Sequence, residues 1–220
     1  MVNDNTATRQ RLIITFGKFG ALKYTSNLDT AKIWERVLRR ADLPLLYSEG
    51  FNTRPRIQLA NALPPGFTSE CELLDVSLRM PVALKGVAEH LTAVSPQGLR
   101  VYDIREASIH TPALQTLVRS AEYHIHFLDE IDRALLQARV EALLNRDSII
   151  KTTERKARKS ASDLRPLLYD LRIDETGDLL THLATGERGN FRPDDLLREM
   201  QMDHYPVTIH RLRLHTEVSK

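Results

Sequence analysis

Residues 10–42 read QRLIITFGKFGALKYTSNLDTAKIWERVLRRAD, and this stretch sets the fold expected for the first half of the chain. Its opening residues are mostly apolar and β-branched, which predicts a strand that ends at a glycine turn beginning with Gly17. Ser26 and Asp29 form the pattern that starts a helix, because such a pair caps exposed backbone amides. Apolar residues then recur every three or four positions, which predicts a helix over about 28–42.

The same patterns elsewhere predict an order of elements that repeats. In the first half they indicate strands near 56–60, 71–80 and from Leu99, with a helix after Pro81. In the second half they indicate strands at 117–127, 148–153, 164–173, 178–185 and 206–215, with helices at 129–144, opened by Asp129, and from Pro193. We therefore predict an α+β protein of two ferredoxin-like (split βαβ) halves, residues 1–110 and 111–220, with antiparallel sheets and helices packed on one face.

The composition is that of a globular chain with a substantial core, since 42% of its 220 residues are hydrophobic and 27% are charged. No apolar run is long enough for a membrane span, and the polar start MVNDNTATRQ is unlike a signal peptide. We therefore expect a cytoplasmic protein with no membrane partner. The single cysteine, Cys71, excludes an internal disulfide framework and a self-contained thiolate metal site.

Positive charge is concentrated in the first half. The formal net charge is only +2, but residues 1–110 carry 14 Lys and Arg against 11 Asp and Glu, whereas residues 111–220 carry 17 against 18. The predicted first helix has a basic ridge away from its apolar stripe: Lys32, Arg36, Arg39 and Arg40. A solvated helix face, partly neutralised by Glu35, is the alternative to a binding role. The residues expected to bind RNA are Lys18, Arg36, Arg39, Arg40, Asn52, Arg54 and Arg56.

Residues 47–52 read YSEGFN and combine polar side chains with aromatic ones, which suits a binding site. Glu49 and Tyr47 are weak candidates for catalysis, with Glu49 as a general base or as an acceptor for a base edge. Asn52 would donate and accept hydrogen bonds, and Tyr47 or Phe51 would stack on a base. The alternative is a simple turn that uses the backbone freedom of Gly50 and buries Phe51 in the core.

Two histidines, His124 and His126, lie two apart on a predicted strand and so share a face, as two metal ligands would. No third ligand is evident from the sequence, so we predict no metal site and no cofactor. A basic loop is expected near 154–162, and it is either a second phosphate-contacting arm or simply a soluble loop. Its basic residues are Arg155, Lys156, Arg158 and Lys159.

The stretch from Gly17 to Asp75 carries a family resemblance. GKFGALKYTSNLD, ERVLRRADLPLLYSEGFNTRPRIQLANALPPGF and ECELLD closely resemble the signature of the radical-SAM-linked proteins. DLRP at 163–166 and FRPDDLL at 191–197 resemble later segments of that family. Its members occur beside, or fused to, a radical S-adenosylmethionine (SAM) protein and have no established activity. The resemblance therefore implies a radical SAM protein as partner.

Two positions depart from that family's pattern. Asn27 after Ser26, and Arg54 before Pro55, stand where the family has histidine. If those histidines do chemistry in the relatives, this chain has lost that chemistry or performs it otherwise.

A radical SAM enzyme holds its iron–sulfur cluster through three clustered cysteines, which Cys71 alone cannot supply. We therefore expect an accessory protein that binds RNA or presents a substrate to a radical SAM protein, in the modification of translation-related RNA. One alternative is a metal-independent RNA-processing enzyme, a nuclease or transferase that uses Glu49, Tyr47 and nearby arginines. Another is an adaptor whose basic ridge meets an acidic protein surface. The sequence leaves open whether the chain is an enzyme.

Overall fold

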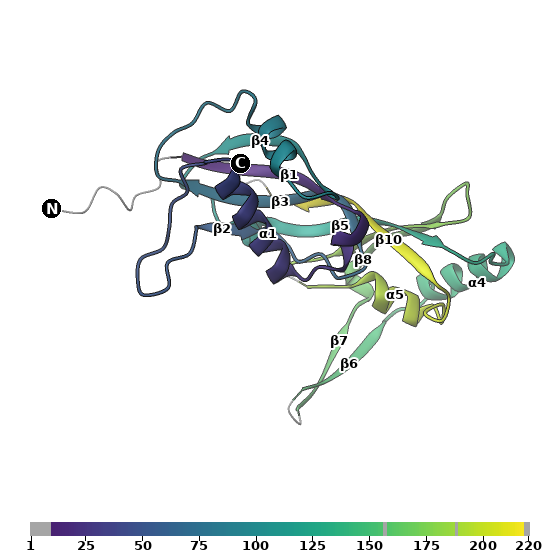
Figure 1. Cartoon of the computed structure of the whole chain (residues 1–220). Helices are drawn as coiled ribbons and strands as arrows, with labels where there is room; N and C mark the ends of the chain where they lie inside the picture. Colours follow the sequence, from purple (N-terminus) through teal and green to yellow (C-terminus); the bar gives the residue numbers. More distant parts are fainter. Residues whose placement is uncertain (1–9, 156–157, 188, 218–220) are drawn as a thin grey trace. The chain divides into compact units, whose positions relative to one another are not determined.

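The computed structural model describes residues 10–155, 158–187 and 189–217. The chain divides into two compact units, of which the first ends at Val118 and the second begins at Arg119. Both units combine helices with mostly antiparallel strands (Figure 1), which confirms the predicted mixed class of helices and antiparallel sheet. Within the described ranges, every helix is too short or too polar to cross a membrane.

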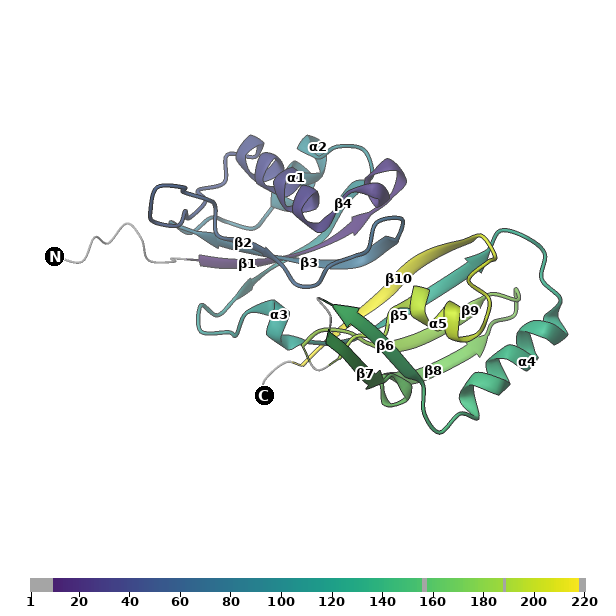
Figure 2. The same ribbon diagram turned by 90° about the horizontal axis from the view of Figure 1, so that it is seen from below.

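In the first unit the strands lie in the order β4–β1–β3, with β2 beside β3, and each of these pairs is antiparallel. Figure 2 shows α1 and α2 together on one face of this sheet. The elements in chain order are β1 (Gln10–Lys18), the 3-10 helix η1 (Gly20–Tyr24), α1 (Asn27–Arg40), β2 (Ile57–Leu59), β3 (Thr68–Leu78), α2 (Val87–Val94), β4 (Leu99–Ala107) and α3 (Leu114–Leu117).

Helix α1 begins where the sequence predicted. The Ser26 hydroxyl oxygen accepts a hydrogen bond from the Asp29 amide at 3.1 Å and caps the helix. The same hydroxyl donates to the Asp29 carboxylate at 2.7 Å, and this bond lowers the pKa of Asp29 below its usual range. Asp29 therefore stays charged beside the positive end of the helix dipole.

The apolar stripe of α1 packs on alternate residues of β1 and β3 in the core of the first unit. Trp34 is completely buried, and its ring meets that of Phe16 edge to face with centres 4.9 Å apart. Leu12 and Ile14 extend the same surface along β1. Because this stripe faces the sheet, the charged residues of α1 must face solvent.

The face of the first sheet away from α1 is organised by a buried ion pair. Arg11 in β1 donates through Nε to Oδ1 of Asp75 in β3 at 3.0 Å. The same guanidinium donates to the carbonyl oxygens of Thr111 and Pro112, which follow β4. The Arg11 side chain thus connects two strands to the segment around residue 111. This segment belongs to the first unit, whereas the sequence predicted a boundary after residue 110.

In the second unit the strand order is β10–β5–β9–β8. The elements in chain order are β5 (Val118–Phe127), α4 (Arg133–Leu144), β6 (Ile150–Arg155), β7 (Arg158–Asp163), the 3-10 helix η2 (Arg165–Leu167), β8 (Leu168–Ile173), β9 (Leu179–Ala184), α5 (Pro193–Glu199) and β10 (Val207–Thr216). The predicted start of α4 at Asp129 was wrong. The Asp132 carboxylate accepts a hydrogen bond from the Ala134 amide at 2.8 Å, so the helix starts at Arg133.

Strands β6 and β7 pair with each other as a separate two-stranded hairpin. Most of the predicted basic loop near 154–162 is strand instead, since residues 154–155 belong to β6 and residues 158–162 to β7, and residues 156–157 lie outside the described residues. The side chains of its basic residues are also outside the described part of the chain, so a second phosphate-contacting arm stays a prediction.

Removing one partner of the Arg11–Asp75 pair should destabilise the first unit strongly. In Asp75→Ala a buried guanidinium loses its counter-ion, and we expect the free energy of unfolding to fall by about 3–5 kcal/mol. Replacing both residues by leucine should lower it less, because no buried charge remains. Urea denaturation measures both changes. Arg172→Ala removes an exposed ion pair with Asp170 and is the control, with an expected loss of at most about 1 kcal/mol. An equally small loss in Asp75→Ala would contradict the structural role given to the pair.

Candidate nucleic-acid interface

The basic ridge, Lys32, Arg36, Arg39 and Arg40, lies on the solvent side of α1, and all four residues are exposed. Two of them are neutralised within the helix. Lys32 Nζ lies 3.9 Å from an Asp29 carboxylate oxygen, and Arg39 Nη2 lies 2.7 Å from a Glu35 carboxylate oxygen. Within the described part of the chain, Arg36 and Arg40 make no ion pair, so their charges are available to a ligand.

The segment after α1 folds back to form a closed loop. Tyr47 and Pro55 form a β-bridge across it. The Ser48 amide donates to the Arg54 carbonyl oxygen at 2.8 Å, and the Arg54 amide donates to the Ser48 hydroxyl oxygen at 3.0 Å. These contacts fix the base of the 47–55 loop and leave its tip in solvent.

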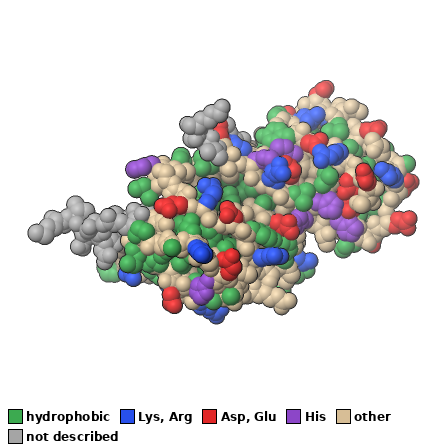
Figure 3. Space-filling view, turned by 90° about the horizontal axis from the view of Figure 1, so that it is seen from above, with side chains coloured by type: hydrophobic (Ala, Val, Ile, Leu, Met, Phe, Trp, Pro, Cys, Tyr) green, Lys and Arg blue, Asp and Glu red, His purple; other side chains and the backbone are tan. Residues whose placement is uncertain are grey.

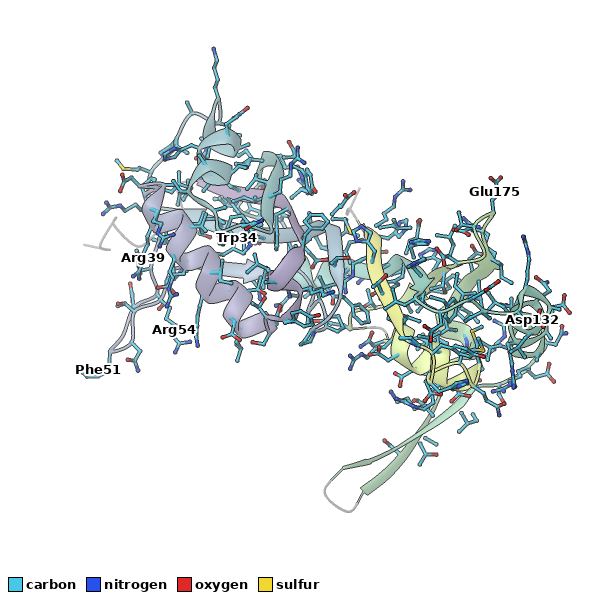
Figure 4. All side chains as sticks on the ribbon, turned by 45° about the vertical axis from the view of Figure 1, so that its right-hand side comes forward. Trp34, Arg39, Phe51, Arg54, Asp132 and Glu175 are labelled. Atoms are coloured by element: carbon cyan, nitrogen blue, oxygen red, sulfur yellow. The ribbon has the colours of Figure 1, made fainter. Side chains whose placement is uncertain are left out.

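The tip of the 47–55 loop carries Gly50 and Phe51. Gly50 has φ of 111°, a left-handed backbone that favours glycine, so the predicted turn is present. The alternative that placed Phe51 in the core was wrong, because its ring is fully exposed. Figure 4 shows Phe51 at the end of this loop, on the same side of the first unit as Arg39 and Arg54.

Arg39 connects the basic ridge to the 47–55 loop. Its Nε donates to the Tyr47 hydroxyl oxygen at 3.2 Å, and its guanidinium carbon lies 5.7 Å from the centre of the Tyr47 ring, a cation–π contact. Residues 43–50 line an open hollow of about 630 Å³ together with Thr53 and Arg79. The sequence patterns did not point to Arg79, because it follows β3 and only the fold brings it to the same hollow as Tyr47 and Glu49.

Two residues expected to bind RNA lie elsewhere. Strand β1 does not end at Gly17 but runs on to Lys18, which keeps the inward direction of Phe16 two residues earlier. Lys18 is therefore only 2% exposed, and its Nζ donates to the Thr25 carbonyl oxygen at 2.8 Å. Such a buried ammonium group is not accessible to a phosphate.

Arg56 is separated from the basic ridge by the sheet itself. Leu59 of β2 packs in the core beneath α1, and residues at alternate positions of the strand face the other way. Arg56 accordingly lines a second hollow, of about 410 Å³, with Arg11 and Asp75. The contacts between the candidate residues join Arg39 to Tyr47, which lines the 630 Å³ hollow with Glu49. Arg54 is hydrogen-bonded to Ser48 at the base of the same loop. Asn52 next to Phe51, and Arg36 and Arg40 on α1, are exposed.

Charge is mixed on one face of the protein. On the face displayed in Figure 3, basic and acidic side chains are interspersed, as a net charge of +2 leads one to expect. A polyanionic ligand would therefore be held by a local group of arginines and not by a field that covers the whole protein.

The fold and this surface define a small mixed α/β protein with an exposed aromatic loop beside arginines. The chain belongs to the family described as "Uncharacterized protein conserved in bacteria (DUF2344)", whose model matches residues 11–193. This match names no partner, so the link to radical SAM proteins remains a prediction. No curated protein matches the chain.

Similarity to solved structures is distant. In a Cbf5–Nop10–Gar1 complex the matching chain is 11% identical with a TM-score of 0.45, over 92% of this chain and 48% of that one. In an archaeal box H/ACA sRNP Nop10–Cbf5 complex the matching chain is 12% identical with a TM-score of 0.43, over 94% of this chain and 48% of that one. An unknown protein from Galdieria sulphuraria is 12% identical with a TM-score of 0.28, over 95% of this chain and 99% of that one. The chain thus spans about half the length of the chains in the two complexes.

Proposed function

We propose that this protein binds single-stranded RNA through the basic ridge and the 47–55 loop. The observation that carries the proposal is the fully exposed ring of Phe51 at the tip of a hydrogen-bonded loop. A phenylalanine left in water forgoes about 1.5–3 kcal/mol of burial free energy, so its position contributes nothing to folding. Unstacked bases bind to rings presented in this way.

The neighbours of Phe51 supply the polar half of such an interface. Asn52 is exposed beside the ring and can both donate and accept hydrogen bonds at a base edge. Arg54 and Arg40 are exposed and carry guanidinium groups, which form two parallel hydrogen bonds to a phosphate. Arg36 extends the line of positive charge along α1. The combination of one stacking ring with a few arginines is that of a single-strand binder.

Single-stranded RNA suits this surface better than duplex nucleic acid. Duplex binders depend on a broad positive face, whereas here the charge is local and the net charge is small. Sequence-specific RNA recognition instead uses splayed bases that stack on aromatic side chains. An acidic protein could also bind the arginines. Such a partner would not explain why the Phe51 ring is exposed at the tip of the loop.

We further propose that the bound RNA is the substrate of a radical SAM protein, for which this chain is the accessory partner. The support is the sequence resemblance between Gly17 and Asp75, together with a single cysteine in the chain. Affinity purification of the tagged chain without oxygen and after nuclease treatment should recover an iron–sulfur protein. Recovery of partners that all lack clustered cysteines would contradict this part of the proposal.

We also propose that each unit is ferredoxin-like. Strand order β4–β1–β3–β2 in the first unit and β10–β5–β9–β8 in the second, each with two helices between strands, supports this class. In the second unit the hairpin of β6 and β7 would then be an insertion.

Replacing Phe51 by alanine should weaken RNA binding. Loss of one stacked base costs about 1–3 kcal/mol, so we expect the dissociation constant for a labelled single-stranded RNA to rise about 5- to 150-fold. Fluorescence anisotropy measures this constant. Phe51→Trp should bind like the natural chain because it keeps an aromatic face. Ile109→Ala removes another exposed apolar side chain, at the hollow that contains Arg11, and should bind normally. Unchanged affinity in Phe51→Ala would refute the stacking role.

Replacing Arg40 or Arg54 by alanine should make binding less sensitive to salt. Each lost phosphate contact lowers the slope of log K against log salt concentration by about 0.7 for a single strand. Titrations between low and moderate salt determine the slope. Lys85→Ala removes an equal exposed charge of the same unit, from the segment before α2, and is the control. If the salt slope is the same for the natural chain, Arg40→Ala, Arg54→Ala and Lys85→Ala, neither arginine contacts a phosphate.

A further inference from the structure

The sheet of the second unit presents histidines on the side opposite its apolar residues. In β5, Tyr123, Ile125 and Phe127 are buried, whereas His124 and His126 alternate with them and point the other way. Figure 3 displays histidine side chains gathered on the second unit. Ile125 pairs with Leu179 of β9, so the turn that precedes β9 lies next to these histidines.

Two carboxylates of that turn meet His124. The distance from His124 Nε2 is 3.1 Å to Asp178 Oδ2 and 3.4 Å to Asp174 Oδ2. The ligand atoms of these three residues all lie within 4.8 Å of one another. In a tetrahedral zinc site with bonds of about 2.0–2.2 Å, neighbouring ligand atoms are about 3.3 Å apart. Both measured separations are close to that value.

The carboxylates are held in place by the turn itself. Asp174 Oδ1 accepts hydrogen bonds from the Thr176 hydroxyl at 2.7 Å, the Thr176 amide at 2.9 Å and the Asp178 amide at 3.0 Å. These three bonds hold the Asp174 carboxylate in one orientation. Its Oδ2 stays directed at His124.

His126 supports the second carboxylate. Its Nδ1 lies 3.0 Å from Asp178 Oδ1 and 2.9 Å from Oδ2, and Asp178 is buried. Contacts from this ring nitrogen to both oxygens hold the Asp178 carboxylate in place, and a histidine behind a ligand carboxylate can orient it in this way. His126 is thus a positioning residue and not a ligand of the trio.

We propose that His124, Asp174 and Asp178 bind one divalent cation of the zinc class. Two carboxylate oxygens face His124 Nε2, and a cation between them would be bound by all three atoms. A mixed imidazole and carboxylate set suits zinc-class ions, whereas magnesium prefers oxygen ligands and retains its water. Three protein ligands leave a fourth position open, and the His124 side chain is 32% exposed, so water or a substrate atom can reach it. The site lies wholly in the second unit and does not depend on RNA binding.

Calorimetric titration of the full, untagged chain after treatment with EDTA tests this site. Zn²⁺ should bind with a stoichiometry of one per chain, and Mg²⁺ in a parallel titration should bind far more weakly. Changing a group that supports a metal ligand weakens metal affinity by about 10- to 100-fold, and we expect a loss of this size for His126→Ala. His124→Ala removes a ligand itself, so its Zn²⁺ affinity should fall by more than about 100-fold. His204→Ala, an exposed histidine of the same unit outside the cluster, should bind like the natural chain.

A folding control accompanies each variant. Thermal unfolding in EDTA shows whether the variant is folded, and Zn²⁺ should raise the melting temperature of the natural chain and of His204→Ala but not of His124→Ala. If His124→Ala does not fold, Asp174→Asn keeps the shape of the side chain and should lose binding in its place. No stoichiometric Zn²⁺ binding by the natural chain, or equal binding by His124→Ala or Asp174→Asn, would overturn the proposal.

Discussion

The first unit depends on the contact between Trp34 of α1 and Phe16 of β1. Within the described residues the indole N–H of Trp34 has no hydrogen-bond partner, which costs about 1–3 kcal/mol. Deleting a buried tryptophan side chain typically costs about 3–5 kcal/mol, so packing outweighs the missing hydrogen bond. Because this contact fixes the rotation of α1 on the sheet, it also directs Arg36 and Arg40 to solvent and Arg39 towards Tyr47.

Buried charges explain why the basic excess of the first half overstates what a ligand meets. Arg11 and Lys18 contribute to that excess, yet both are buried and bonded to groups of the same unit. Arg39 and Lys32 are paired with carboxylates of their own helix. The positive charge left for a partner is therefore small and local, which favours a ligand that also needs an aromatic ring.

The two units offer different chemistry. The surface of the first unit combines arginine with an exposed aromatic side chain, which suits recognition of bases and phosphates. On the second unit imidazole and carboxylate groups meet at a turn, which suits a soft to intermediate divalent cation. Since no residue is shared, each proposal stands or fails without the other, and RNA binding with or without Zn²⁺ would show whether the two sites act together.

Local patterns in the sequence determined most of the order of strands and helices, the Ser26 cap and the basic ridge, because neighbours within a few residues decide helix starts and faces. They missed β7 and α3. The solvent exposure of Arg36 and Arg40 could be predicted in this way. Only the tertiary structure decided that Lys18 is buried, that Arg56 faces away from α1, that Phe51 stands in solvent and that His124 meets Asp174 and Asp178. Each of these depends on the register between strands or on how a loop closes, and pairings between residues far apart in the chain leave no periodic signal.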